Sequence, residues 1–225
     1  MPPVALPIRV FLIDDHPVFR RGIAAILESD PRFSVVGEAD DAPTALAALR
    51  GLEVDAVVVD LALRRGSGLD VLQSIKAEHP AMEALVLSMH DEEVYAERAL
   101  RAGARGYLMK DSPPDRVRDA VMRVAKGEVV TSERVNSLLV RRAIDGQRPS
   151  RLIESLSNRE LDVFGLIGRG LSTKEIAQHL HLSVKTIETH RANIKVKLEL
   201  KDGADLVRAA ILAASNAVTS VAREP

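Results

Sequence analysis

The sequence places polar side chains directly after four short apolar segments. Asp14 and Asp15 follow the first segment, Asp60 follows the second, Ser88 ends the third and Lys110 follows the last. Ligands bind outside the carboxyl ends of parallel strands, and those ends meet at one edge of a sheet. The sequence therefore predicts one site that combines three carboxylates, a hydroxyl and an ammonium group.

Three carboxylates in one place repel one another unless a cation lies among them. The chain contains no cysteine, so a metal site here would have oxygen ligands, for which Mg²⁺ is the natural choice. A metal ion and Lys110 that neutralise phosphoryl oxygens, beside a carboxylate nucleophile, suit phosphoryl transfer. Two simpler interpretations remain open: Asp60 could merely begin a turn, and Lys110 could balance the charge of a solvated acidic edge.

The stretch Val54–Leu63 is the element around which this site is organised. Five of its first six residues are apolar, and they occupy both odd and even positions. This pattern is typical of a strand buried on both faces of a parallel sheet. Further strands are predicted at residues 8–13, 33–38, 84–89 and 105–109, and a helix follows each strand. Five strands alternating with five helices predict a doubly wound parallel sheet, a five-stranded flavodoxin-like α/β fold.

Residue types also predict where the later helices begin and end. The fifth helix should begin with Ser112 as N-cap and Pro113 at its first position, and Gly127 should end it. One more helix is predicted at residues 132–144, before a polar linker at residues 145–151 that contains glycine and proline.

The C-terminal third of the sequence carries helix signals alone. Two capping boxes, at residues 157–160 and 172–175, each begin an amphipathic segment. A tight turn at residues 181–183 leads into a helix at residues 184–198, and a last helix covers about residues 204–214. Two short helices joined by a turn of about three residues are the signature of a helix-turn-helix, here in a small all-α domain.

The helix predicted at residues 184–198 decides what this domain could bind. Ile187, Ile194 and Leu198 share one stripe at about 100° per residue, so that stripe must face the helical core. The opposite face carries small and polar side chains with cations at its border, which suits entry into the major groove of DNA. The stripe alone would fit a helical bundle that binds protein equally well.

Composition is that of an ordinary globular protein, with 46% hydrophobic and 28% charged residues among 225. No apolar run approaches the roughly 20 residues of a membrane span, and a secretory signal pattern is missing, so we expect a cytoplasmic protein without membrane contact. The first 130 residues carry 16 Lys and Arg against 21 Asp and Glu, a net charge of −5. Residues 151–225 carry 11 against 9, and this asymmetry indicates two domains with different partners.

Residues 8–128 resemble the receiver domain of two-component response regulators, because the acid pair, the central aspartate, Ser88, Tyr107 and Lys110 follow its pattern. The resemblance implies that Asp60 accepts phosphate from a sensor histidine kinase. It implies a Mg²⁺ site made by Asp14, Asp15, Asp60 and the backbone oxygen of Ala62. It also implies phosphoryl binding by Lys110 and Ser88, with Tyr107 swinging inward as Ser88 moves.

One departure from the receiver pattern follows the phospho-acceptor. Relatives usually carry Met-Pro-Gly there, whereas this chain reads Leu63, Arg64, Arg65, Gly66, with the spacing to Gly68 unchanged. The missing proline bears on the stiffness of the loop. The two arginines could alter phosphate lifetime or kinase choice, or they could be solvated surface charges.

Residues 153–215, which contain LSNREL and GLSTKEIAQHLHLSVKTIETHRANIKVKL, closely resemble the LuxR-type DNA-binding domain. With residues 129–152 as linker helix and hinge, the whole chain resembles a NarL/FixJ-type response regulator. The resemblance implies a closed form and an open form that dimerises, through the face spanning Glu92–Lys126. It also implies contacts to double-stranded DNA from these residues: Lys174, Lys185, Thr186, Glu188, Thr189, Arg191 and Lys195.

Glu188 is unusual among these contacts, because an acid that points at DNA repels phosphate. Its carboxylate could instead accept a hydrogen bond from a cytosine amino group. Both interpretations remain open from the sequence.

Three functions compete at this point. The first is a phosphorylation-controlled transcription factor, and the second is a phosphorelay or interaction module whose helical tail binds protein. The third is an aspartyl-phosphate hydrolase, which would need an acid/base partner and a substrate pocket for which the sequence offers no candidate. We therefore expect a DNA-binding regulator and not an enzyme.

Overall fold

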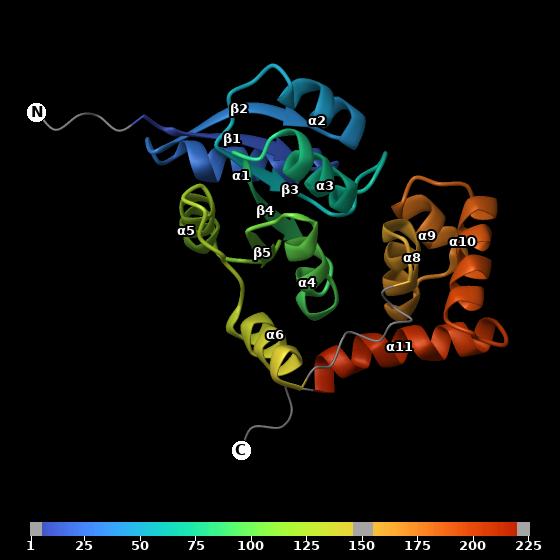
Figure 1. The fold of residues 1–225 in the computed structure, drawn as a ribbon. Helices are drawn as coiled ribbons and strands as arrows, with labels where there is room; N and C mark the ends of the chain where they lie inside the picture. The colour runs from blue at the N-terminus through green and yellow to red at the C-terminus, as the bar shows by residue number, and fades with distance from the viewer. Residues whose placement is uncertain (1–5, 146–154, 220–225) are drawn as a thin grey trace, which may run out of the picture. The chain divides into compact units, whose positions relative to one another are not determined.

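Five short runs of aliphatic and β-branched residues form a parallel sheet in the order β2-β1-β3-β4-β5 (Figure 1). The structure, a computed structural model, describes residues 6–145 and 155–219. This strand order is that of a doubly wound flavodoxin-like sheet, so the predicted fold is confirmed. The strands are β1 (Ile8–Ile13), β2 (Phe33–Ala39), β3 (Ala56–Val59), β4 (Glu83–Ser88) and β5 (Gly106–Met109).

Helices cover both faces of this sheet. Helices α1 and α5 share one face, where their aliphatic side chains form a core with the strands (Figure 1). Helices α2, α3 and α4 follow one another across the other face, so all four residues of β3 are buried. The bounds are α1 (Pro17–Glu28), α2 (Ala42–Leu49), α3 (Gly68–Glu78), α4 (Glu92–Ala102), α5 (Pro114–Val124) and α6 (Glu133–Asp145).

The central strand begins later than predicted, at Ala56, and ends before Asp60 as predicted. Within the stretch Val54–Leu63, only Ala56–Val59 pairs with β1 and β4, and the chain leaves the sheet at Asp60. The carboxylate therefore lies immediately after the last paired residue, at the carboxyl end of the strand.

The predicted ends of α5 are wrong. Pro113 is the N-cap and Pro114 takes the first helical position, whereas Ser112 lies one residue before the cap. A residue that precedes proline is disfavoured in the helical region, so Pro113 remains extended, with ψ 146°. At the other end the helix finishes at Val124, and Gly127, with φ 80°, belongs to the turn that follows.

The described C-terminal residues, 155–219, contain helices and no strands, as predicted. Both capping boxes are present, and Ser183 caps α10 by accepting from the Thr186 amide. Helix α8 packs against α10 and α11, and α9 packs against α10, so α9 and α10 form a helix-turn-helix (Figure 1). The bounds are α8 (Asn158–Gly168), α9 (Thr173–His179), α10 (Val184–Lys197) and α11 (Gly203–Thr219), the last of which is longer than predicted.

The chain divides into two compact units, residues 1–136 and 137–225. Helix α6 confirms the helix predicted at residues 132–144, but most of the predicted linker at residues 145–151 lies outside the described residues. Among the helices that the structure describes, none combines the length and the apolar character that a membrane span requires.

A cluster of charged side chains ties the amino ends of β1 and β3 together, at the edge opposite the predicted site. Arg9 donates to Asp55 Oδ2 through Nε at 3.1 Å and to Asp55 Oδ1 through Nη2 at 2.8 Å. Arg9 also forms an ion pair with Glu53. The side-chain hydrogen bonds from Arg9 hold the pKa of Asp55 below its usual value of 3.8.

We expect Arg9→Met to lower the free energy of unfolding slightly at neutral pH, because solvent screens this partly exposed pair. A carboxylate with a lowered pKa contributes stability above its unfolded-state value, and that stability is lost as the pH falls through the folded-state value. Urea denaturation should therefore show the full difference from wild type at neutral pH and a shrinking difference below pH 3.8.

The control for this prediction is Arg50→Met. It removes a more exposed ion pair, in which Arg50 lies 3.5 Å from Glu78, and should change stability little at any pH. A difference for Arg9→Met that persists undiminished in acid would show that the Asp55 charge is not its source.

Candidate functional site

Four side chains converge at the carboxyl ends of β1, β3, β4 and β5. Asp60 is 3% exposed and lies at the centre of this cluster. Ser88 Oγ donates to Asp60 Oδ1 at 2.9 Å, and Lys110 Nζ donates to Asp60 Oδ2 at 2.7 Å. Lys110 also lies 2.6 Å from Asp14 Oδ2, so one ammonium group bridges two carboxylates. The two oxygens of Asp60 are thus held by donors from two neighbouring strands.

Burial and charge together set the protonation of this cluster. Burial, followed by the nearby charge of Asp60, raises the pKa of Asp14 above its usual value. Burial disfavours the charged form of Lys110, but the charges of Asp60 and Asp14 outweigh this effect and raise the lysine pKa. Lys110 is therefore a cation at neutral pH, and it offsets part of the negative charge of Asp14 and Asp60.

The acid pair and the central aspartate form an acidic pocket. Asp14, Asp15, His16 and Asp60 place ligand atoms within 4.8 Å of one another. The amide of Ala62 donates to Asp60 Oδ1 at 3.3 Å, which brings the following loop to the rim of this pocket. Several carboxylate oxygens at such separations are compatible with a metal ion.

Tyr107 is fully buried and points inward. Its hydroxyl donates to the backbone oxygen of His90 at 2.8 Å, and the His90 amide donates to Ser88 Oγ at 3.3 Å. The His90 ring stacks on Tyr95 of α4, with ring centres 4.5 Å apart. Burial, followed by the charge of Asp60, raises the pKa of Tyr107 well above its usual value, so the phenol keeps its proton. Contacts therefore run from Asp60 through Ser88 to α4.

The loop between β3 and α3 is tied to the start of α2. Arg64 Nη2 lies 2.7 Å from Asp40 Oδ2, and Arg65 Nη1 lies 3.4 Å from Asp41 Oδ2. Both arginines are exposed, and their ion pairs with Asp40 and Asp41 lie on the neighbouring loop and not on the acidic pocket. The pairs constrain a loop that lacks the usual proline.

Sequence reasoning missed several side chains around the pocket. Their common signal is position. Three of them lie shortly after the acid pair, at the start of the helix that leaves the same sheet edge, and the fourth lies shortly after Ser88. Arg20 donates to the backbone oxygen of Asp14 and, at 2.8 Å, to Glu38. The missed residues are His16, Phe19, Arg20 and His90.

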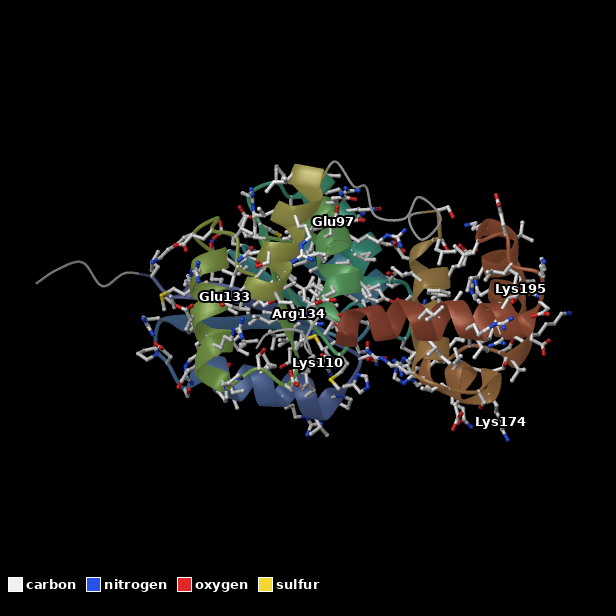
Figure 2. All side chains as sticks on the ribbon, turned by 90° about the horizontal axis from the view of Figure 1, so that it is seen from below. Glu97, Lys110, Glu133, Arg134, Lys174 and Lys195 are labelled. Carbon is white, nitrogen blue, oxygen red and sulfur yellow. The ribbon has the colours of Figure 1, made fainter. Side chains whose placement is uncertain are left out.

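Helix α10 presents two different faces. Ile187 and Ile194 are fully buried and Leu198 is 8% exposed, which confirms the predicted stripe. The opposite face is open to solvent, and Figure 2 shows Lys174 and Lys195 projecting from the surface of the helical unit. A helix with an exposed polar face and border cations can enter a DNA groove.

The seven residues predicted to contact DNA differ in exposure. Thr186 also takes part in the cap of α10, since its hydroxyl lies 2.7 Å from Ser183 Oγ. The Thr189 hydroxyl donates to the Lys185 backbone oxygen at 3.1 Å. The exposed members are Lys174, Lys185, Glu188 and Thr189, and the half-buried members are Thr186, Arg191 and Lys195.

An ion pair fixes α10 against α8. Lys197 Nζ lies 2.6 Å from Glu160 Oε2, and the same oxygen accepts from the Ser157 amide at 2.7 Å in the capping box. Burial lowers the pKa of His190, which favours the neutral ring expected of a packed structural histidine. The orientation of the exposed face of α10 is thus set by contacts on its buried side.

Comparisons with known proteins cover both units. Residues 10–122 match the response regulator receiver domain, and residues 154–210 match the luxR family of bacterial regulatory proteins. The chain belongs to the NarL/FixJ-type response regulators. It is a two-component response regulator with a receiver domain and a LuxR-type DNA-binding domain, and this family regulates transcription and is not a class of enzymes.

The curated relatives of this response regulator match it over most of their length. It is 37% identical to the nitrate/nitrite response regulator protein NarP of Escherichia coli over 199 residues, which cover 88% of this chain and 92% of the relative. It is 34% identical to the oxygen regulatory protein NreC of Staphylococcus haemolyticus, with 90% and 96% covered.

Solved structures of response regulators match this chain over most of its length or over its receiver domain alone. RcsB from Salmonella enterica serovar Typhimurium, bound to promoter rprA in the presence of a phosphomimetic, is 26% identical to this response regulator, with a TM-score of 0.60. That match covers 90% of this chain and 97% of RcsB. The receiver domain of the putative response regulator NarL from Mycobacterium tuberculosis is 34% identical over 54% of this chain and 98% of its own, with a TM-score of 0.52.

Proposed function

We propose that this response regulator accepts a phosphoryl group on Asp60 from a sensor histidine kinase and thereby controls its own binding to DNA. The observation that carries the proposal is the pair of donors on Asp60, with Ser88 on one oxygen and Lys110 on the other. Donors that are already aimed at the acceptor would bind the phosphoryl oxygens after only a small movement.

In the transfer step, a carboxylate oxygen of Asp60 attacks the phosphorus of a phosphohistidine on the kinase. A P–O bond forms, the P–N bond breaks, and the electron pair of the broken bond stays on the imidazole nitrogen. Lys110 and Ser88 would then bind the phosphoryl oxygens. Once Ser88 is drawn toward the phosphoryl group, Tyr107 would be retained in its inward position.

Asp14, Asp15, Asp60 and the backbone oxygen of Ala62 would hold Mg²⁺. The donor set supports this choice, since Mg²⁺ prefers oxygen ligands and takes few carboxylates. When bound, Mg²⁺ would neutralise negative charge on the phosphoryl oxygens.

Double-stranded DNA would be the second partner of this cytoplasmic protein, through the seven residues on and near α10. The solved structure of RcsB on a promoter supports this assignment, as does one described as two RcsB dimers bound to two parallel DNAs. We propose a homodimer on activation, through the face spanning Glu92–Lys126, that reads two half-sites about one DNA turn apart or a multiple of it. The working boundaries are residues 8–128 for the receiver, 129–152 for linker helix and hinge, and 153–215 for the DNA-binding domain.

Lys185→Ala and Lys195→Ala should each weaken binding to all DNA sequences and reduce the salt dependence of the binding constant by about one unit, as expected for one lost phosphate contact. Substitutions of Thr189 and Glu188 should instead change which sequences are preferred, because these residues would face base edges. The measurement is a salt-titrated binding assay on specific and unrelated DNA.

Arg208→Ala is the matched control, since it removes a cation on α11 that pairs with Asp205. Its salt dependence should equal that of wild type. Unchanged DNA binding in all four α10 variants would favour a helical domain that binds protein.

A further inference from the structure

Lys110 has a third partner besides the two carboxylates, namely the aromatic ring of Phe19. Lys110 Nζ lies 4.4 Å from the centre of this ring, compared with 2.6 Å from Asp14 Oδ2 and 2.7 Å from Asp60 Oδ2. The lysine side chain is only 5% exposed, so these groups replace much of the water around its ammonium. A desolvated cation over an aromatic face is attracted more strongly than an exposed one.

Phe19 belongs to the first turn of α1, shortly after the acid pair. Its side chain packs against the core formed by α1, α5 and the sheet, and it lines a pocket together with Asp14, Asp60 and Ile23. Packing therefore fixes the ring at the base of the acidic site, where its face meets the lysine.

The three partners of Lys110 differ in how they would change during phosphoryl transfer. Asp60 loses its carboxylate charge when an acyl phosphate forms, and Asp14 belongs to the proposed metal site. The face of a benzene ring keeps its negative potential in every state. Of these three partners, Phe19 alone keeps its attraction for the ammonium unchanged.

We propose that Phe19 is a positioning residue for phosphoryl transfer: its ring holds the Lys110 ammonium beside Asp60 while the carboxylates exchange partners. The inference rests on the proposed role of Asp60 as phospho-acceptor. With the ring in place, the ammonium stays where charge develops on the phosphoryl oxygens. Without it, the flexible four-carbon stem of lysine would reach that position for a smaller fraction of the time.

Two substitutions at Phe19 separate the effect of the aromatic face from the effect of side-chain size. Phe19→Leu keeps an aliphatic side chain in the core, and Phe19→Tyr keeps the aromatic face. With full-length protein, a small acyl phosphate donor and saturating Mg²⁺, labelling of Asp60 should be about tenfold slower in Phe19→Leu and within about twofold of wild type in Phe19→Tyr. The dissociation constant for Mg²⁺, measured by calorimetry, should stay within about twofold in both, because the ring acts on the lysine.

Two further readouts distinguish positioning from packing. The Hε protons of Lys110 should resonate upfield in wild type and Phe19→Tyr, where they lie over the ring, and lose this shift in Phe19→Leu. In a Lys110→Ala background, Phe19→Leu should slow labelling no further, since no ammonium remains to be held. An equal loss of rate with and without the lysine would overturn the proposal.

If Phe19→Leu fails to fold, Phe19→Met, which has an unbranched apolar side chain, replaces it with the same expected rate. Wild-type labelling at Asp60 together with an undiminished rate in the folded ring-less variant would overturn this inference and leave the proposed function intact. A wild-type protein that takes no label at Asp60 would overturn both.

Discussion

Asp60→Asn should abolish phosphorylation, so that no label from a phosphohistidine donor stays on the protein in the presence of Mg²⁺. A carboxamide is not an anionic nucleophile and cannot form the acyl phosphate. Asparagine has the size of aspartate and can accept from Ser88, so the buried site should keep its shape. The measurement is incorporation of labelled phosphate, with the modified peptide identified by mass spectrometry.

Two variants make this result interpretable. Asp70→Asn changes an exposed carboxylate in the first turn of α3 and should be labelled like wild type. Asp15→Ala should lose labelling through the loss of a metal ligand. Full labelling of Asp60→Asn would exclude Asp60 as the acceptor.

Fragment 150–225 should bind DNA about a hundredfold more tightly than unphosphorylated full-length protein, as expected if about 1% of that protein is in an open form. Phosphorylation should close most of this gap. The phosphoryl group adds about −1.5 to −2 charges, and it can act on DNA binding only by changing the relative stability of two states. A shift from about 1% to 99% open requires roughly 5.5 kcal/mol, part of which dimerisation could supply.

Affinities for this comparison should be measured at one salt concentration, because phosphate contacts make binding salt-dependent. Full-length Asp60→Asn treated with the phosphoryl donor is the control and should remain a weak binder. The net charge of −5 on the first 130 residues is compatible with a closed form in which the receiver covers the more basic C-terminal part. Equal affinity of fragment, unphosphorylated and phosphorylated protein would exclude this gating.

The fold class could be predicted because apolar runs alternate with helical patterns, and such patterns indicate which residues are buried. The carboxyl end of β3, directly before Asp60, could also be predicted, but its start could not. Val54 is only 6% exposed, yet pairing of the strand begins at Ala56. Hydrophobicity indicates burial and says nothing of backbone pairing. The start of α5 was misplaced for a related reason, since Pro113 and Pro114 both satisfy the preference for proline at a helix start.

The convergence of Asp14, Asp60, Ser88 and Lys110 could be predicted because each lies at the end of a parallel strand. The contact with Phe19 could not, since it depends on how α1 is rotated about its axis against the sheet. The ion-pair partners of Arg64 and Arg65 could not be predicted either, because a long arginine side chain can pair with any acidic residue nearby.

Strand β5 is at the edge of the sheet, yet its outer side is covered. The Tyr107 amide donates to the Val130 backbone oxygen at 2.9 Å, and the Val130 amide donates to the Arg105 backbone oxygen at 2.8 Å. An uncovered strand edge is a template on which another chain can add a strand, and so a source of aggregation. The short segment before α6 therefore protects the receiver from edge-to-edge association, and a fragment cut at residue 128 would lose that protection.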